Sequence, residues 1–209
     1  MKMWKEPKLS YLCKKERFAR QRYKEVLKWV KSLGFELKGF TLDAGCGRGF
    51  AAKMFQEMGC IIVGLDISKE FAKSALSMGI TVIVGDIQNP PLKPEVFDII
   101  VCFEVLEHIP NIKKALNAIN KLLKKGGLFI STMPLLHPLN IIVDFVRGET
   151  THINNLSKNV WLRMVQEYFK VVGIKTIFIP PLPPTLYGRY FILNLGLFNS
   201  HMWICCVKH

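Results

Sequence analysis

A short glycine-rich loop between a strand and a helix constrains this chain more than any other feature of its sequence. The loop carries three glycines: Gly45, Gly47 and Gly49. Glycine has no Cβ atom, so it adopts backbone angles that other residues avoid and lets a ligand touch the backbone. The loop follows the apolar run Phe40–Asp43, and the next apolar run, Cys60–Leu65, ends at Asp66. A carboxylate there can accept hydrogen bonds from the hydroxyls of a ribose, so loop and acid together predict an adenosine-type ligand.

The spacing of the glycines separates two classes of adenosine ligand. Dinucleotide-binding folds use G-x-G-x-x-G, whereas the spacing here is G-x-G-x-G and Phe50 stands where the third dinucleotide glycine would be. Asp43, just before the loop, would repel a pyrophosphate but suits the ammonium and sulfonium groups of S-adenosylmethionine (SAM). The sequence therefore favours SAM as the cofactor and disfavours a NAD-dependent oxidoreductase.

Further motifs follow the loop in order along the chain. They are a strand followed by an acid (Ile80–Val84, then Asp86), a strand running into Glu-Val-Leu-Glu-His (Phe97–Phe103, then 104–108), a helix (Ile112–Leu123), a Lys-Lys-Gly-Gly turn and a fifth strand (Leu128–Thr132). Over residues 38–133 this order resembles the class I SAM-dependent methyltransferases, in particular the type 11 and quinone-biosynthesis group. Several motifs in the right order are a far more specific signal than any one of them.

The resemblance implies a Rossmann-like α/β fold. Its sheet is expected to have seven mostly parallel strands with an antiparallel C-terminal edge strand, and helices on both faces. In similar enzymes the acid after the third strand contacts the adenine amino group, and the next residue packs on the ring. Carried over to this chain, the residues expected to bind SAM are Asp43, Gly45, Gly47, Asp66, Ile67, Asp86, Ile87 and Phe103.

Alternating apolar runs and amphipathic stretches independently indicate βαβ units and a parallel sheet. We expect a basic helical cap over residues 1–36 and a SAM-binding methyltransferase domain over 37–209, with lid segments at about 134–156 and 180–201. The apolar stretch Tyr190–Val207 contains too many polar residues for a membrane span, which needs about 20 predominantly apolar residues. We expect its end, Met202–Val207, to be the last strand, paired with Val171–Ile179.

The region Ser10–Lys31 has apolar residues at helical spacing and a strongly basic opposite face that includes Arg20 and Arg22. The resemblance implies that this helix packs over the cofactor, with Tyr11 and Arg17 as candidates for touching cofactor or substrate. The chain has a net charge of +13, which suits an anionic substrate or RNA bound by this helix. A solvated cationic face is the favoured alternative, because the lysines are spread along the whole chain.

The six cysteines form no C-x-x-C pair and no Cys/His cluster at zinc spacing, so no metal site is predicted. Several lie inside predicted strands and are expected to be reduced, buried thiols of a cytoplasmic protein. The N-terminus is too polar for the apolar core of a signal peptide.

The reactive methyl group belongs to SAM, so the protein needs to align it with the acceptor and, for some acceptors, to remove a proton. Candidate bases are Glu104 and His108, after the fourth strand, and His152 in the segment beyond the fifth. For His108 a structural role is favoured over a catalytic one, while the two are evenly balanced for His152. Whether a base is needed stays open.

The acceptor is constrained mainly by exclusion. The end of the fourth strand carries neither the N/D-P-P-Y motif of amino-group methyltransferases nor a Pro-Cys nucleophile. Apolar segments around the expected site favour a small, hydrophobic or anionic acceptor that receives the methyl group by in-line displacement. The alternatives are an RNA-modifying methyltransferase and a SAM-binding protein without transferase activity, and the oligomeric state is left open.

Overall fold

The computed structural model describes residues 9–138, 152–154, 156–178 and 200–209. Its centre is a seven-stranded sheet in the order β3-β2-β1-β4-β5-β7-β6. The strands are β1 (Phe40–Ala44), β2 (Ile61–Asp66), β3 (Thr81–Val84), β4 (Phe97–Phe103), β5 (Leu123–Pro134), β6 (Lys170–Ile177) and β7 (His201–Val207). The neighbours among β1 to β5 pair in parallel, so their carboxyl ends lie at one edge of the sheet.

Strand β7 supplies the expected antiparallel strand. It pairs antiparallel with both β5 and β6, so it lies one place inside the edge and β6 is the outermost strand. The Rossmann-like, mostly parallel sheet is thereby confirmed, and the end of the chain closes it as the sequence predicts.

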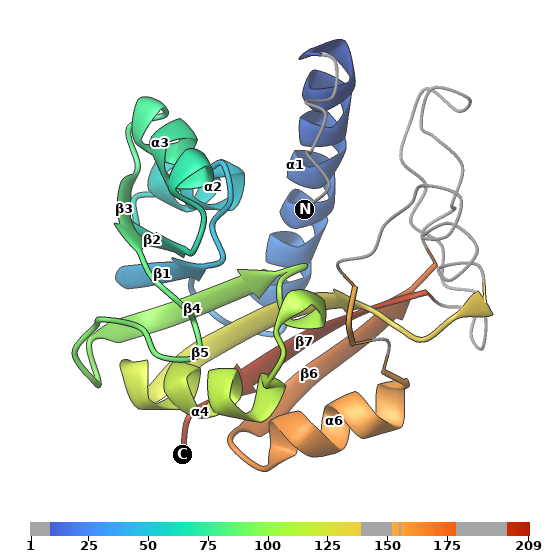
Figure 1. Ribbon diagram of the computed structural model, residues 1–209. Coiled ribbons are helices and arrows are strands. Elements are labelled where there is room, and N and C mark those ends of the chain that lie inside the picture. Colours follow the sequence, from blue (N-terminus) through green and yellow to red (C-terminus); the bar gives the residue numbers. More distant parts are fainter. Residues whose placement is uncertain (1–8, 139–151, 155, 179–199) are drawn as a thin grey trace.

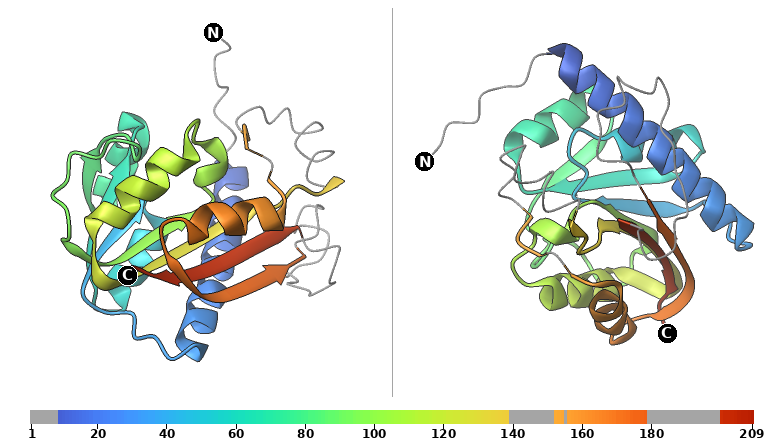
Figure 2. Two further views of the ribbon diagram at one scale, coloured as in Figure 1. Left: turned by 90° about the horizontal axis from the view of Figure 1, so that it is seen from below. Right: turned by 90° about the vertical axis from the view of Figure 1, so that its right-hand side faces the viewer.

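Helices cover both faces of the sheet, as Figures 1 and 2 show. The helices are α1 (Leu9–Ser32), α2 (Phe50–Glu57), α3 (Lys69–Ser77), the short 3₁₀ turn η1 (Leu106–His108), α4 (Ile112–Leu122) and α6 (Lys158–Gln166). Helices α1 to α3 lie on one face, and α4 and α6 lie on the other.

Two hydrophobic cores, one on each face, follow from the alternation of side chains along the strands. On β4, Ile100 and Cys102 join the core under α4 and α6, while Ile99, Val101 and Phe103 join the core under α1 and α2. A strand buried on both faces reads as a continuous apolar run. For this reason, the apolar runs of the sequence predict the central strands.

Strand β5 departs furthest from its expected bounds, while the other elements agree to within one or two residues. Strand β5 begins at Leu123 rather than Leu128, because Leu123 already pairs with Phe97 before the ladder resumes at the Ile99–Leu128 pair. The Lys-Lys-Gly-Gly segment is therefore an irregular start of the strand. Gly126 has a φ of +72° there, a backbone angle that favours glycine.

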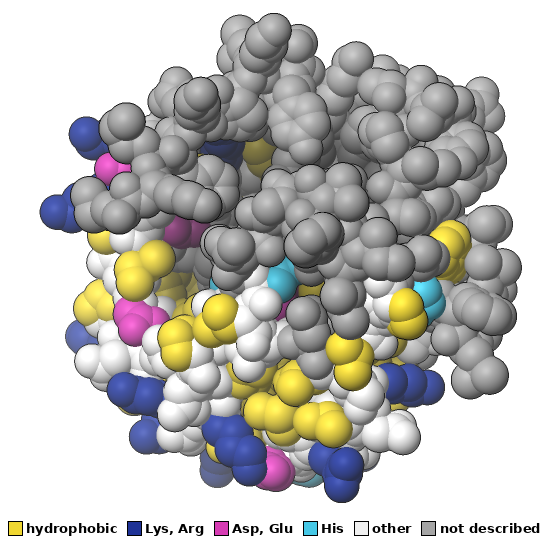
Figure 3. Space-filling view, turned by 45° about the vertical axis from the view of Figure 1, so that its right-hand side comes forward, with side chains coloured by type: hydrophobic (Ala, Val, Ile, Leu, Met, Phe, Trp, Pro, Cys, Tyr) yellow, Lys and Arg dark blue, Asp and Glu magenta, His cyan; other side chains and the backbone are white. Residues whose placement is uncertain are grey.

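The cysteines that the structure describes with their side chains are buried and unpaired, as expected: Cys46, Cys60, Cys102, Cys205 and Cys206. Across the described ranges, no helix is long and apolar enough to cross a membrane. Much of both expected lid segments lies in residues 139–151 and 179–199, outside the described residues. On the face shown in Figure 3, lysine and arginine side chains are scattered around the margin rather than gathered in one patch.

Candidate active site

The glycine loop joins β1 to α2, and backbone hydrogen bonds hold it against β2. The backbone N–H groups of Gly45 and Cys46 both donate to the carbonyl oxygen of Leu65, at 2.7 and 3.0 Å. Gly45 and Gly47 have φ angles of +80° and +51°. A Cβ atom on Gly45 would lie 2.5 Å from Val105 Cγ2, whereas one on Gly47 would meet nothing within 4 Å. Gly45 is thus needed for packing, and Gly47 borders open space in which a ligand could touch the backbone.

Asp66 lies against this loop at the end of β2. Its Oδ2 accepts a hydrogen bond from Gly47 N at 2.7 Å, and its Oδ1 accepts one from Ser68 N at 2.9 Å. Each carboxylate oxygen can accept a second hydrogen bond, so the acid is held in place and can still receive ribose hydroxyls. The next residue, Ile67, is 72% exposed, which leaves an apolar side chain uncovered beside the acid.

Asp43 is buried at the end of β1. Its Oδ2 accepts a hydrogen bond from Ala52 N, in the first turn of α2, at 2.9 Å. Burial raises the pKa of this carboxyl to about 7, with a further contribution from the negative charge of Asp66. A buried carboxyl with a raised pKa is one that a bound cation would stabilise in its ionised form.

Asp86 follows β3, so the three acids lie at or just beyond the carboxyl ends of three neighbouring strands. Its Oδ1 accepts a hydrogen bond from Gln88 N at 2.8 Å, and the Gln88 amide nitrogen contacts both of its oxygens at 3.2 and 3.1 Å. Ile87 is only 6% exposed and belongs to the core under α4.

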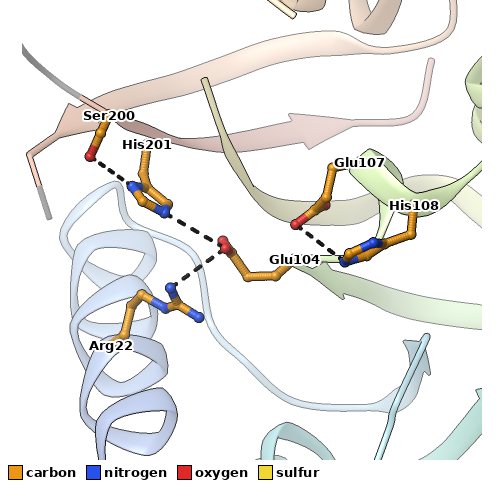
Figure 4. A network of polar contacts seen from close by, with 6 residues as sticks. All are labelled: Arg22, Glu104, Glu107, His108, Ser200 and His201. Carbon is orange, nitrogen blue, oxygen red and sulfur yellow. Dashed lines mark hydrogen bonds and ion pairs between the residues drawn. The ribbon is translucent and has the colours of Figure 1, made fainter. Parts of the chain in front are cut away.

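The end of β4 carries a separate network of polar groups, shown in Figure 4. Glu104 has a φ of +56°, in the left-handed region that is strained for a non-glycine residue. Its Oε2 lies 3.5 Å from Arg22 Nη1 and 3.8 Å from His201 Nε2. His201 Nδ1 in turn lies 2.9 Å from the Ser200 hydroxyl.

The ionisable groups of this network differ in their charge near neutral pH. Burial acts to raise the pKa of Glu104, but the positive charge of Arg22 and smaller contributions from neighbouring groups together outweigh it and hold the pKa below its usual value. Burial lowers the pKa of His201 to about 4, so His201 is neutral near pH 7 and Arg22 provides the lasting countercharge. A carboxylate with a lowered pKa is a weaker base, which favours a positioning role for Glu104.

Helix α1 reaches the site through residues that sequence reasoning did not select. Arg22 was expected on a solvated cationic face, but its side chain is only 16% exposed because it contacts Glu104. Tyr23 packs against Phe103 with ring centroids 4.9 Å apart, and burial raises the pKa of its hydroxyl to about 12. The side chains of Tyr11 and Arg17, the two residues selected instead, lie outside the described part of the chain.

Two of the three candidate bases lie together, and the third does not belong to their group. The rings of His108 and His152 have centroids 4.8 Å apart. Glu104 contacts Arg22 and His201 instead. No local pattern marked His201, because its contact with Glu104 depends on β7 pairing beside β5.

Comparison with known proteins agrees with this geometry. Residues 42–131 match the family model of the methyltransferase domain. The chain is 35% identical over 115 residues to a ubiquinone biosynthesis O-methyltransferase of Paraburkholderia phymatum, covering 51% of this chain and 50% of the relative. It is 42% identical over 93 residues to an uncharacterised protein of Methanocaldococcus jannaschii, covering 44% and 43%. The chain therefore spans about half the length of the curated relatives it matches.

Solved structures share the fold over nearly the whole chain. A SAM-dependent methyltransferase from Thermotoga maritima superposes with a TM-score of 0.69 at 23% identity, covering 93% of this chain and 91% of that one. The YcgJ protein of Bacillus subtilis gives a TM-score of 0.65 at 16% identity, covering 90% and 99%. At these identities the likeness concerns the fold alone. Together with the match over residues 42–131, it shows that this part of the chain is a methyltransferase domain with the fold found in SAM-dependent methyltransferases.

Proposed function

We propose that this protein transfers a methyl group from SAM to a small, hydrophobic or anionic acceptor by direct in-line displacement. The observation that carries the proposal is a set of three acids at or just beyond the carboxyl ends of three adjacent strands, beside an open glycine loop: Asp43, Asp66 and Asp86. A cationic adenosine cofactor offers one partner for each acid: an ammonium group, a ribose and an adenine amino group.

The chain's own residues would bind the cofactor and exclude water around it. Asp66 would accept the ribose hydroxyls while staying fixed to Gly47. Ile67 would cover the adenosine, and Asp43 would face the ammonium group. Tyr23 and Phe103 form an aromatic wall at the end of β4. SAM supplies the electrophilic methyl group, so alignment and water exclusion are the main tasks of the protein.

An acceptor hydroxyl is the natural extension of this proposal, because several curated relatives are named O-methyltransferases. RNA is a weaker candidate. Two arginines of the basic helix are paired within the molecule, Arg20 with Glu57 and Arg22 with Glu104, so part of that face is already neutralised. The other candidate is a protein that binds SAM without transferring its methyl group. The transfer experiment below distinguishes it from a methyltransferase.

The first test is SAM binding by calorimetry. Asp66→Ala is expected to weaken binding by tenfold or more, because each hydrogen bond to a charged group contributes about 1.5–3 kcal/mol. Asp98→Ala is the matched control. Asp98 also accepts a backbone N–H, that of Phe40 at 2.8 Å, but it lies at the start of β4, at the opposite edge of the sheet. Equal SAM affinity in the two variants would contradict the site.

The second test is methyl transfer. Labelled SAM and a fractionated extract are incubated with the protein, and label is measured in small-molecule, lipid, RNA and protein pools. Label in the small-molecule or lipid pool is the expected outcome. Label confined to RNA would favour the RNA-modifying alternative, and SAM binding without transfer would favour a binding protein.

A further inference from the structure

Three side chains with metal-binding atoms meet just beyond the end of β4, next to the Glu104 network. They are Glu107, His108 and His152, and one ligand atom of each lies within 4.8 Å of the others. The Nε2 atom of His108 is 3.9 Å from Oε1 of Glu107, and the two side chains point toward each other in Figure 4. The Glu107 side chain is 1% exposed and that of His108 36%, so the group has one buried acid and an accessible side.

The two segments that carry these side chains are tied together by their backbones. The N–H groups of Ile153 and Asn154 both donate to the carbonyl oxygen of Glu107 at 3.0 Å. The side-chain amide of Asn154 donates to the carbonyl oxygen of Ile109 at 2.7 Å, across 45 positions of sequence. The two residues that follow His152 are thus tied to the segment that carries Glu107 and His108.

We propose that Glu107, His108 and His152 bind one divalent transition-metal ion. Two imidazoles and one carboxylate are a ligand set of zinc enzymes and of other open metal sites, in which the remaining positions take water or substrate. The separation of 3.9 Å between Glu107 and His108 is too long for a direct hydrogen bond. Ligands of one tetrahedral ion lie about 3.3 Å apart, so small side-chain rotations would close the site.

The position of this site bears on the acceptor, an inference that rests on the proposed function. The turn η1 follows β4, so the ion would lie at the same edge of the sheet as Asp43, Asp66 and Asp86. An acceptor hydroxyl bound at an open position loses its proton to solvent more readily. The resulting oxygen anion forms the O–CH₃ bond as the S–CH₃ bond breaks, and the electron pair of that bond stays on sulfur. The substrate class is therefore a hydroxyl compound able to coordinate a metal.

The experiment uses the full chain, free of any affinity tag and treated with a chelator. Co²⁺ is titrated while its visible absorption is followed, and Zn²⁺ binding is measured by calorimetry. One ion per chain is the expected result. His152→Ala is expected to weaken binding by more than about tenfold, because even changes to groups behind metal ligands cost 10–100-fold.

His209→Ala is the matched control, because His209 is an exposed histidine at the C-terminal residue. Glu107→Gln tests the buried acid. If that variant does not fold, His108→Ala and His152→Ala, whose side chains are partly exposed, still test the site. Absence of stoichiometric binding, or equal affinity in His152→Ala and His209→Ala, would overturn the proposal.

Calorimetry with SAM on the same metal-free protein separates this inference from the proposed function. SAM binding without metal binding would refute the metal site alone. Loss of both would refute the proposed function as well. Activity toward a hydroxyl acceptor that is lost on chelation and restored by the metal, but not in His152→Ala, would support the link between the two.

Discussion

Asp43 is buried, yet its carboxyl group must be ionised to bind a cation. Burial raises the pKa of this carboxyl to about 7, so near neutral pH the free protein holds a mixture of its two forms. If the ammonium group of SAM needs the ionised form, binding expels a proton whenever the carboxyl is protonated. The dissociation constant for SAM should then rise by up to about tenfold for each pH unit below 7.

The measurement is SAM affinity by calorimetry between pH 5.5 and about 8.5, a range that brackets this pKa. Asp43→Asn cannot ionise, so it is expected to bind SAM weakly and with a flat pH profile. Buffers of different ionisation enthalpy report proton release directly. A wild-type affinity that is independent of pH would show that Asp43 does not face the ammonium group.

Substitutions at two of the three loop glycines, Gly45 and Gly47, are expected to have different effects. Gly45→Ala places a Cβ atom 2.5 Å from Val105 Cγ2 and also strains a φ of +80°, so it should lower both the unfolding temperature and SAM affinity. Gly47→Ala meets no atom within 4 Å and carries only the cost of its φ of +51°, about 1–2 kcal/mol. It should lose SAM binding with a smaller loss of stability. Thermal unfolding and calorimetry on both variants check this, and a larger loss of stability in Gly47→Ala would contradict it.

At the scale of elements, α1 is fastened to the sheet by apolar packing and by one shielded ion pair. Val26 and Val30 are fully buried, and Trp29 packs against Trp203 of β7 with ring centroids 6.0 Å apart. Arg22 then reaches Glu104 at the end of β4. The helix that the sequence marks by its charge is therefore held mainly by its apolar side.

The chain offers a matched comparison for the Arg22–Glu104 pair. Arg20 and Glu57 make a closer ion pair, at 2.8 Å, but both side chains are about half exposed. Exposed pairs typically contribute 0.2–1 kcal/mol, and leaving a buried polar group unsatisfied costs about 1–3 kcal/mol. Double-mutant cycles with Arg22→Gln/Glu104→Gln and Arg20→Gln/Glu57→Gln, read by urea unfolding, should give the larger coupling energy for the first pair. Equal couplings would show that burial does not govern the contact.

The strands and helices were largely predictable from the sequence, whereas the side-chain contacts between them were less so. Strands β1 to β4 are apolar runs bounded by glycine or acidic residues, a pattern that period and composition reveal. The predicted bounds of β5 were wrong because Leu123 already pairs with Phe97, ahead of a bulge that contains Gly126 and Gly127. Asp43 and Asp66 lie within the single βαβ unit formed by β1, α2 and β2, so they could be identified from the local sequence. Arg22, His201 and the contact of His108 with His152 depend on tertiary packing across long stretches of chain, which no local pattern records.

At the scale of the whole molecule, the candidate cofactor site draws on the ends of β1, β2, β3 and β4 and on α1. Those elements come together only in the folded chain, so SAM should bind the native state and not the unfolded one. Binding then stabilises the molecule by about 2.7 kcal/mol at a SAM concentration 100 times the dissociation constant. For a domain of this size, each kcal/mol shifts the unfolding temperature by about 2–4 °C.

We therefore expect saturating SAM to raise the unfolding temperature by about 5–10 °C. Scanning calorimetry over a series of SAM concentrations checks the size of the shift and its logarithmic dependence on concentration. Asp98→Ala should retain the shift even if its starting temperature is lower, and Asp66→Ala should lose most of it. NADH at the same concentrations should leave the unfolding temperature unchanged, because Asp43 disfavours a pyrophosphate. A shift with NADH that matches the shift with SAM would mean that the loop does not select its ligand by charge.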